Sequence, residues 1–297
     1  MLNKKYSGRE ISSVFLLIFP VMAYYMVFWL RPVYRAVIEA FTDSAGSFSL
    51  ENLIRLSGQQ DIREAFLNTL IFTIGSMVVQ FFLSIGISLF LSKKFKFSNL
   101  LLFITMIPMA FPPIAVGILW KSGFYKFGWV NSLLYNLHLV GADNLIDWMS
   151  FTKINAVLFL IVVDTWTVLP SIVIILLAGF QNLNKEFAEA GRVFGANRLQ
   201  TVKDIVLPIM KPTIVTAMIL RLIAAIQVWL IAVMIYGYNA SPYLVERIAY
   251  KIDVVAFAEN SKKDAYVLSV IVAVVVMLAA YLYIRVSNRA KKQGEVV

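Results

Sequence analysis

The sequence lacks cysteine altogether and has a single histidine, His138, among its 297 residues. Without cysteine there is no disulfide, no thiolate metal site and no cysteine nucleophile. One histidine cannot build a histidine metal cluster, and we expect His138 to be a solvated loop residue. Charge is scarce as well, at 15% of residues, where about 25% is usual in soluble domains. We therefore expect no catalytic constellation, no metal site and no bound cofactor in this chain.

Apolar residues dominate instead, at 60% of the chain, against about 45–50% in soluble proteins. Runs of about 20 apolar residues are long enough to cross a bilayer as helices. The sequence thus predicts an all-α polytopic membrane protein whose transmembrane domain, residues 11–288, contains six helices. The predicted spans are residues 11–30, 66–91, 98–120, 154–180, 212–236 and 265–284.

The first apolar run, Ile11 to Leu30, follows a basic start, as the core of a signal peptide would. It is longer than the roughly 7–15 residues of such a core, and no small-residue cleavage site follows it. We expect a retained first helix, with its N-terminus in the cytoplasm, that Arg31-Pro32 closes.

Lys and Arg residues indicate on which side each loop lies. Segments predicted inside the cell hold 15 Lys and Arg in 61 residues, those predicted outside hold 11 in 97, and Arg221 within a span completes the 27. The inside density is about twice as high, in agreement with the positive-inside rule. We therefore expect both termini in the cytoplasm, and we assign the net charge of +10 to cytoplasmic loops rather than to nucleic-acid binding. The inside segments are 1–10, 92–98, the loop 181–211 and 285–297, of which 289–297 is the C-terminal tail; the outside segments are 31–65, 121–153 and 237–265.

Three prolines, Pro108, Pro112 and Pro113, lie in the third span. Each removes a backbone donor and clashes with the preceding turn, so a straight helix is not expected there. Freed carbonyls at membrane depth are tolerated only inside protein or against a water-filled cavity. The bend either borders a translocation path or is purely structural. In the outside loops we expect short helices, one of them interfacial in residues 121–153.

Polar residues within the spans are candidates for a functional site. The second span carries small and hydroxyl residues and Gln80, so we expect it to pack inside the bundle; Gln80 either lines a pathway or bonds to another helix. Asp164 and Arg221 fall near mid-membrane, where an isolated charge costs roughly 2.5–3.5 kcal/mol. They either pair, share a polar cavity or find separate partners. A regular helix cannot turn Arg221, Gln227 and Trp229 all toward one narrow pore, so at least one of these is structural.

The loop between the fourth and fifth spans carries helix-capping signals. Asn184 is a good N-cap, and Glu186 lies in the first turn, where the helix dipole favours an acid. Gly195 can end this helix in a left-handed conformation, and Asn197 with Gln200 can start a second one. We expect two short helices, the second terminated or bent by proline before the membrane.

The first of these helices has an apolar stripe formed by Phe187, Ala190, Gly191 and Phe194. An amphipathic helix lying on the bilayer would show a similar stripe. Docking on a protein partner explains Ala190 and Gly191 better, because such small residues allow close backbone approach.

One spacing in this loop carries a family resemblance. Glu189-Ala190-Gly191 is followed after three residues by Gly195, and after nine more by Ile205-x-Leu207-Pro208. This closely resembles the EAA loop of permease subunits in binding-protein-dependent ABC importers. Gly191 stands where the commonest form has Ala, a change that preserves smallness. Other stretches similar to the sugar-permease branch are Asn68-Thr69-Leu70, Ile107 to Trp120, Asn131, Asp164 to Phe187 and Leu220 to Trp229, so that the likeness covers roughly residues 66–288.

The resemblance implies a type I importer permease of the maltose and glycerol-phosphate kind. In that family two permeases form the pathway, two cytoplasmic ATPases each receive one coupling helix, and an extracytoplasmic solute-binding protein delivers the substrate. No G-x-x-x-x-G-K-[ST] motif occurs here, so ATP and Mg²⁺ would bind to the partner ATPases. Sugar branches usually pair two different subunits, so we expect a second, related permease in the cell membrane and a sugar as substrate. The residues implied in ATPase coupling are Glu186, Glu189, Ala190, Gly191, Gly195, Ala196, Leu207 and Pro208.

Several readings remain open. Trp166, Trp229 and Tyr236 could stack on sugar rings, although such residues in membrane helices more often serve packing; with Gln80, Asp164, Arg221 and Gln227 they are the pathway candidates. A permease of the same class for an amino acid, glycerol phosphate or another small solute is the strongest alternative. An ion-coupled secondary transporter would tend to show an internal repeat, and an integral-membrane enzyme would need an acid/base or metal cluster.

Overall fold

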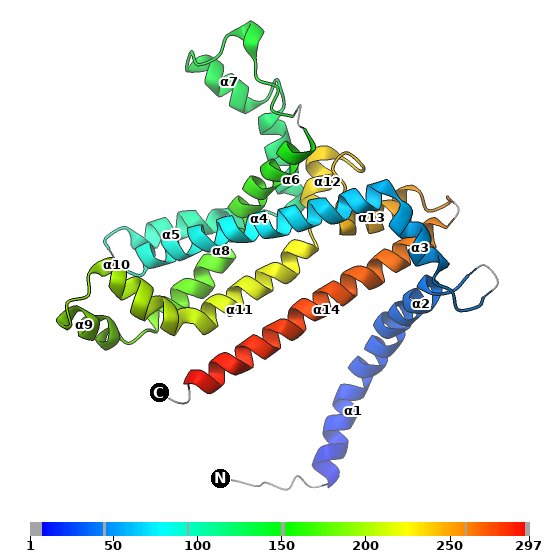
Figure 1. Ribbon diagram of the computed structural model, residues 1–297, viewed down its shortest axis with the longest axis horizontal. Coiled ribbons are helices and arrows are strands. Elements are labelled where there is room, and N and C mark those ends of the chain that lie inside the picture. The colour runs from blue at the N-terminus through cyan, green and yellow to red at the C-terminus, as the bar shows by residue number, and fades with distance from the viewer. Residues whose placement is uncertain (1–7, 44–45, 94, 150–151, 259, 295–297) are drawn as a thin grey trace.

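The protein is a helical bundle from which two arms project (Figure 1). The structure, a computed structural model, describes residues 8–43, 46–93, 95–149, 152–258 and 260–294. Within that part of the chain there are helices and no strand, apart from one bridge between Thr42 and Phe48. Most of the predicted N-terminal tail, residues 1–7, lies outside the described residues, whereas the predicted C-terminal tail is described up to Gly294 and belongs to the last helix.

The α-helices follow one another with short connections. They are α1 Gly8–Tyr25, α2 Arg31–Ala40, α3 Glu51–Gly58, α4 Gln60–Leu91, α5 Ser98–Met106, α6 Pro113–Phe124, α7 Trp129–Asn136, α8 Lys153–Gln181, α9 Lys185–Val193, α10 Arg198–Gln200, α11 Leu207–Ile226, α12 Leu230–Tyr236, α13 Leu244–Ala249 and α14 Ser261–Gly294. Short π-helical turns lie at Met26–Leu30, Thr201–Val206 and Tyr250–Val254, and 3₁₀ turns at Ile107–Ala110 and Ala142–Asn144.

Helices long and apolar enough to cross a membrane number five in the described residues, or up to six if one bent pair counts as a span. These helices overlap all six predicted spans. The five are Phe15–Ala40, Gln60–Leu91, Ile154–Gln181, Arg198–Ile226 and Ser261–Leu282, and the bent pair is Ser98–Ala110 with Pro113–Asn136.

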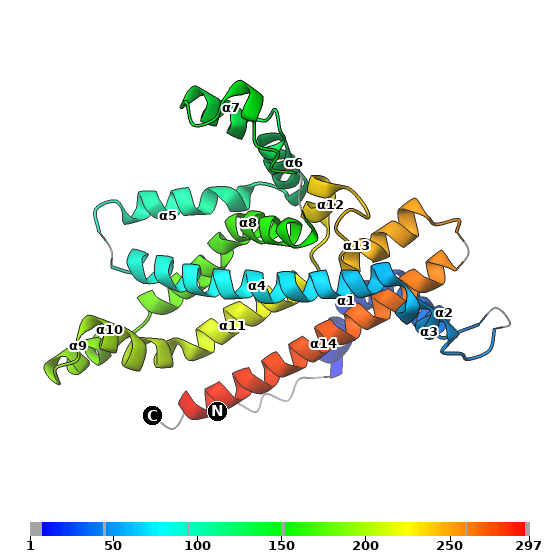
Figure 2. The same ribbon diagram turned by 45° about the horizontal axis from the view of Figure 1, so that its top comes forward.

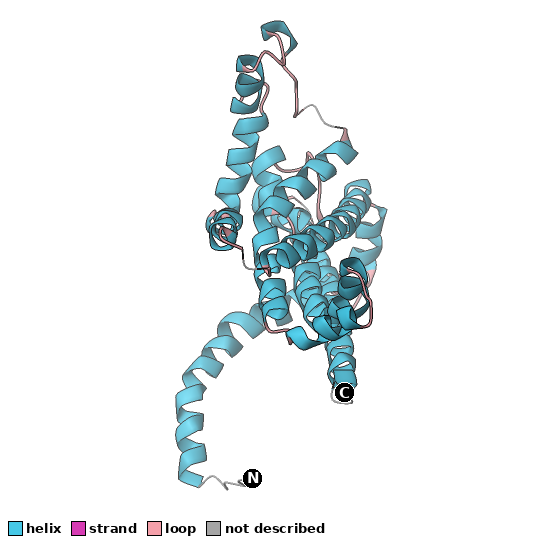
Figure 3. Ribbon diagram, turned by 90° about the vertical axis from the view of Figure 1, so that its left-hand side faces the viewer, coloured by secondary structure: helices cyan, strands magenta, loops and turns pink. Residues whose placement is uncertain are grey.

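The first helix does not end at Arg31-Pro32 as expected. It continues through the π-helical turn Met26–Leu30 into α2 and ends at Ala40. Pro32 directly follows the π-helical turn, and such a turn has already shifted the hydrogen-bond pattern of the preceding helix. This helix leaves the bundle as one of the two arms (Figures 1 and 3), and the most apolar stretch of the helix is not buried by the rest of the chain.

The third span is broken, as its prolines predict. The 3₁₀ turn Ile107–Ala110 ends α5, and α6 begins at Pro113 after a turn of 97°. The break is sharper than a kink. It sends α6 and α7 outward as the second arm, while α5 stays beside α4 (Figure 2). The short helix expected in the loop after this span is α7.

The fifth span departs from the predicted range at both ends. A single helix runs from Arg198 to Ile226 through Pro208 and Pro212, so the second short helix of the loop is the start of a membrane helix. The π-helical turn Thr201–Val206 precedes Pro208, which sits in the first turn of α11. At the other end the helix stops before Gln227, and α12 follows from Leu230.

The core is built around α4, which packs along α8 and α11, and α14 packs on the other side of α11. Close approach of α4 and α8 occurs at Gly75, where an added Cβ would lie 2.7 Å from Cδ1 of Ile161. The polar face of α4 points inward, which confirms the predicted packing of this helix inside the bundle. Its buried polar residues are Asn68, Thr69, Thr73, Ser76, Gln80, Ser84 and Ser88.

Candidate functional site

Three of the predicted intramembrane residues form one hydrogen-bonded cluster between α4, α8 and α11. Arg221 on α11 forms an ion pair with Asp164 on α8. Gln80 on α4 lies between them: its Oε1 accepts from Nε of Arg221 at 2.6 Å, and its Nε2 donates to Oδ2 of Asp164 at 2.8 Å. The hypothesis that the two charges pair is therefore confirmed, and Gln80 joins a helix–helix contact. We call these residues the buried triad.

The buried triad satisfies charges that water cannot reach. The side chains of Arg221 and Asp164 are only 4% and 5% exposed. A buried charge without a partner costs several kcal/mol, whereas a paired and hydrogen-bonded one can be neutral in its net contribution. The guanidinium also donates to Oγ of Ser76 at 3.4 Å, and Gln80 to Oγ1 of Thr165 at 3.4 Å. The arrangement can hold three helices in register, and it displays no acid–base pair to solvent.

The other pathway candidates lie apart from the triad. The break in the helix turns Gln227 outward, where its Nε2 donates to the carbonyl of Ile223 at 3.3 Å. Trp229 occupies the break itself with φ −161° and is half-buried. Because α11 ends at Ile226, the spacing of a regular helix does not fix the directions of Gln227 and Trp229 relative to Arg221.

Trp166 and Tyr236 have packing contacts. Trp166 stacks on Phe111 with ring centroids 6.1 Å apart and meets Trp120 edge-on at 5.8 Å. The hydroxyl of Tyr236 donates to the carbonyl of Ala156 at 2.8 Å. These contacts anchor the bent third span and α12 on α8.

The loop between α8 and α11 has the predicted caps. The backbone N–H of Glu186 donates to Oδ1 of Asn184 at 3.1 Å. Asn197 and Gln200 exchange two hydrogen bonds, at 2.8 and 2.9 Å, in a capping box. Gly195 has φ +87°, a left-handed conformation that glycine adopts at low cost. The caps predicted from Asn184, Gly195, Asn197 and Gln200 are therefore confirmed.

Gly191 contacts Ile205, which lies at the other end of the EAA-type motif. A Cβ at Gly191 would overlap Cδ1 of Ile205, on the turn that leads into α11. The Cβ direction of Gly191 thus points at a side chain of the same chain, and an added methyl would require Cδ1 of Ile205 to shift. The contact links the glycine to the Ile205-x-Leu207-Pro208 end of the motif, and a role of Gly191 in the approach to a partner stays a prediction.

The outer surface of the loop exposes large apolar side chains. Phe194 is 90% exposed and Val193 84% exposed. Glu189 and Ala190 are also exposed, while Ala196 is half-buried and its N–H donates to the carbonyl of Gly191 at 3.0 Å. Of the remaining motif residues, Glu186 and Pro208 are exposed, and Leu207 is half-buried against the core.

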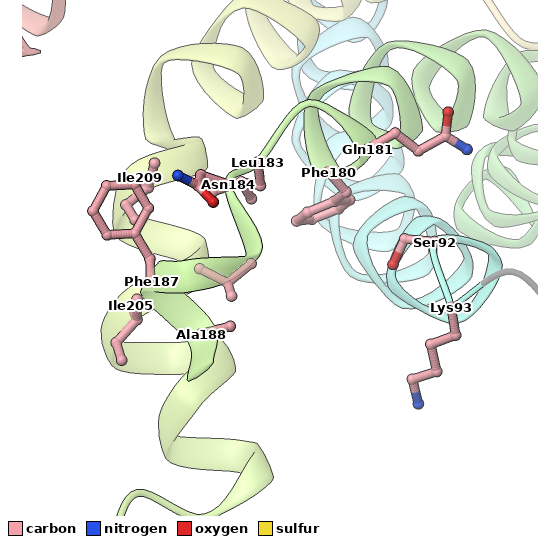
Figure 4. A pocket seen from close by; sticks show the side chains of 11 residues that line it. Ser92, Lys93, Phe180, Gln181, Leu183, Asn184, Phe187, Ala188, Ile205 and Ile209 are labelled. Carbon is pink, nitrogen blue, oxygen red and sulfur yellow. The ribbon is translucent and has the colours of Figure 1, made fainter. Parts of the chain in front are cut away.

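A hollow of about 340 Å³ separates this loop from the ends of α4 and α8 (Figure 4). Phe187, Ala188 and Ile205 line one wall, and Lys93 and Phe180 line the opposite wall. The hollow contains both apolar and polar lining groups. The remaining lining residues are Ser92, Gln181, Leu183, Asn184, Val206 and Ile209.

A second buried cluster, at the far end of α4, was not anticipated. Arg247 on α13 bonds to both carboxylate oxygens of Glu246, at 2.6 and 2.7 Å, to Oδ1 of Asn239 at 2.8 Å and to Asp61 at 3.5 Å. Burial alone would lower the pKa of Arg247. The hydrogen bonds and negative charges of Glu246 and Asp61 more than offset that effect, so the pKa lies above its ordinary value. Adjacent opposite charges in an apolar chain are the signal that could have found it. Ser76 and Thr165, which accept hydrogen bonds from the triad, were missed as well, because hydroxyl residues are common in such helices.

The middle and end of the chain match a family described as "binding-protein-dependent transport system inner membrane component", over residues 80–292. Similar curated proteins include a trehalose/maltose transport system permease protein of Thermococcus litoralis, 28% identical over 80% of this chain and 81% of that protein. A lactose transport system permease protein of Rhizobium radiobacter is 26% identical over 72% of both chains. An arabinooligosaccharides transport system permease protein of Bacillus subtilis is 22% identical over 95% of this chain and 91% of that one.

A solved structure shares the fold. One chain of a bacterial alginate ABC transporter, in complex with a periplasmic protein bound to alginate pentasaccharide, superposes with a TM-score of 0.80. The likeness covers 95% of this chain and 96% of that one, at 18% identity. At that identity the comparison shows the architecture and leaves the substrate open.

Proposed function

The chain belongs to the family of binding-protein-dependent transport system inner membrane components, and on this premise we propose that it is the permease subunit of a carbohydrate importer. It would form half of the translocation pathway for a sugar or oligosaccharide. The observation that carries this proposal is the agreement between the EAA-type loop and similarity to sugar-transport permeases over 72% to 95% of the chain. The nearest alternative is a permease of the same class for glycerol phosphate or an amino acid.

We propose that the polar loop is the coupling element. The loop exposes a surface to which a cytoplasmic ATPase could bind, made of Glu189, Ala190, Val193 and Phe194. Exposed aromatic side chains such as Phe194 are enriched in the cores of protein contacts. This chain would bind no cofactor itself, and ATP and Mg²⁺ would reside on two ATPase partners. A second, related permease would complete the pathway, and an extracytoplasmic binding protein would deliver the substrate.

For the membrane arrangement we propose six spans with both termini in the cytoplasm of the cell that carries the protein. The charge asymmetry of the loops supports this topology. The bent pair α5 and α6 would then count as one interrupted span, because non-helical backbone at membrane depth is tolerated where protein or water satisfies it.

Co-purification after mild solubilisation tests the class. We expect an ATPase subunit and a second permease to accompany the tagged chain, and the ligand of the associated binding protein to be a carbohydrate. Uptake in intact cells should stop when ATP is depleted. Uptake that continues without ATP and collapses with the ion gradient would instead identify a secondary transporter, and an amino acid in the binding protein would replace the sugar with the alternative substrate.

A further inference from the structure

We propose that the hollow between α9 and the ends of α4 and α8 binds an anionic phospholipid of the cytoplasmic leaflet. An acyl chain of the lipid lies against the apolar walls, and Lys93 binds the phosphate. This inference goes beyond the transport of a solute, and it rests on the proposed topology, which places residues 92–98 on the cytoplasmic side.

The first support is the depth at which the hollow lies. Two of the helices that can cross a membrane end beside it, α4 at Leu91 and α8 at Gln181. Lys93 and Asn184, which follow these two ends in the chain, both line the hollow of about 340 Å³. A site where spanning helices end lies at the level of the lipid headgroups and of the first carbons of the acyl chains.

The second support is the amphipathic lining. Phe187 and Ile209 form one wall and Phe180 the opposite wall, while Lys93 extends from the end of α4 beside them (Figure 4). Contact of the apolar walls with water is unfavourable, and a simple anion on Lys93 would leave these walls uncovered. A phospholipid has both parts that the lining can bind, an apolar chain and an anionic headgroup.

The third support is an unbalanced positive charge. Residues 92–98 include three lysines, Lys93, Lys94 and Lys96, and no acid. None of the described residues that line the hollow is acidic, and no carboxylate in the described part of the chain forms an ion pair with Lys93 or Lys96. Each lysine near a cytoplasmic membrane surface strengthens binding to anionic lipid by about five-fold. An anionic headgroup therefore supplies the counter-charge that the described residues do not.

A second hollow, of about 320 Å³, adds hydrogen-bonding groups next to the first. Gln181 lines both hollows, and its amide points away from the first one (Figure 4). Ser98 and Asn99 also line the second hollow. Hydroxyl and amide groups of this kind can donate to phosphate and glycerol oxygens, so the polar part of the lipid has partners on this side of α8.

The surface proposed for the ATPase lies on another side of α9. Phe187 and Ala188 line the hollow, whereas Glu189 and Val193 are exposed. Val193 follows Ala188 by five residues, which is about 140° around a helix. An ATPase bound to that surface leaves the hollow to a different occupant, so that lipid and ATPase can bind at the same time.

Photo-cross-linking in nanodiscs tests the site in the complete complex. Phosphatidylcholine discs contain a trace of either phosphatidylglycerol or phosphatidylcholine that carries a diazirine in its acyl chain, and mass spectrometry maps the cross-linked residues. We expect phosphatidylglycerol to label Phe180, Phe187 and Ile209 about five-fold more than phosphatidylcholine does. Equal labelling of these walls by both lipids would indicate bulk lipid and would overturn the proposal. Absence of labelling there would mean that water or a partner subunit fills the hollow, which would overturn it as well.

Two variants change charge and space separately. Lys93→Gln should lower the labelling by phosphatidylglycerol about five-fold and leave that by phosphatidylcholine unchanged. Lys203→Gln is the matched control, because Lys203 is exposed and lines neither hollow. Ala188→Phe places a ring in the hollow and should lower the labelling of Phe180 and Ile209 with every charge kept. A Lys93→Gln variant labelled as strongly as the unaltered protein would overturn the proposal.

Excess inorganic phosphate distinguishes a lipid site from a site for a soluble anion. We expect phosphate to leave the labelling unchanged, because a free anion does not cover the apolar walls; loss of the labelled lipid would overturn the proposal. Cross-linking is read without transport or ATP hydrolysis. Failure of the lipid site therefore leaves the proposed carbohydrate import standing, since uptake and co-purification test that function separately.

Discussion

Among the individual residues, Arg221 and Asp164 are the most costly to bury, since each places a full charge where hydrocarbon surrounds the helices. The buried triad offsets this cost by giving each charge an opposite charge and an amide of Gln80. Mutual satisfaction of this kind makes each member costly to remove singly and less costly to remove with its partner.

Asp164→Asn should therefore destabilise the protein strongly, because it leaves Arg221 buried without a counter-charge. A loss of about 3 to 5 kcal/mol is expected for breaking such a pair. Thermal unfolding and assembly of the purified complex in detergent measure the loss. The variant Asp164→Asn with Arg221→Gln should recover part of it, and Gln227→Ala, exposed on the same stretch of chain, should change little. Strictly additive damage in the double variant would show that the pair does not act as a unit.

Gln80→Leu should have a smaller effect in the same measurement. The change removes the acceptor for Nε of Arg221 and one donor to Asp164, but it leaves the ion pair in place. Unsatisfied buried groups cost about 1 to 3 kcal/mol. Ser84→Ala, also on the buried face of α4 and bonded only to its own helix at Phe81, is the control. If Gln80→Leu destabilises the protein no more than Ser84→Ala does, the amide of Gln80 does not contribute to the stability of the buried triad.

At the scale of the helices, the loop between α8 and α11 combines local capping signals with one contact between its two halves. Asn184, Gly195 and the Asn197–Gln200 box could be predicted because a cap depends on residues within four positions of one another. The fit of Gly191 against Ile205 could not, because it requires the turn to fold back at a particular angle. The same limit explains Pro32 and the continuous helix through Pro208. Proline disrupts a helix only where its N–H and the preceding turn are needed, and π-helical turns precede both sites.

Gly195→Ala tests the loop as an element. A side chain at φ +87° is strained, which should cost about 1 kcal/mol and displace the turn after α9. We expect the ATPase to be lost from the purified complex, or its hydrolysis to become independent of substrate, while the membrane helices stay inserted. Gly141→Ala is the matched control, because Gly141 has φ −83° and open space around it.

Glu189→Gln should produce a similar uncoupling through a different cause. Glu189 is exposed on α9 and is the acidic position of the motif, so its carboxylate would interact with the partner rather than with this chain. The substrate dependence of ATP hydrolysis is the measurement. Full transport by a variant altered at both Glu189 and Gly195 would refute the assignment of this loop to coupling.

For the whole molecule, the bend of 97° between α5 and α6 makes the number of spans the central question. Single cysteines at Lys96, Lys126 and Lys203, all exposed, can be tested with a membrane-impermeant maleimide in intact cells. We expect Lys126→Cys alone to react, with Lys96→Cys and Lys203→Cys reacting only after permeabilisation, because the loops richer in Lys and Arg stay inside. Labelling of all three only after permeabilisation would mean that the bent pair enters and leaves on one side.

The overall architecture was predictable because it depends on the length and number of apolar runs, which bilayer thickness constrains. The choice of partners within the bundle was open: nothing local relates Gln80 to a charge 84 residues later. The break at Gln227 was likewise hidden, since the residues around it form helices readily. Side chains that meet across helices are selected by packing, and packing depends on all of the elements together.

The order in which the ribosome makes the triad has its own consequence. Asp164 is completed 57 residues before Arg221, a delay of roughly 3 to 11 s at about 5 to 20 residues per second. Gln80 precedes both of them in the chain, so its amide is the triad partner already present when Asp164 is made. The ion pair can form only after Arg221 has followed. The order of synthesis thus makes the amide the first partner available to the acid and the guanidinium the last.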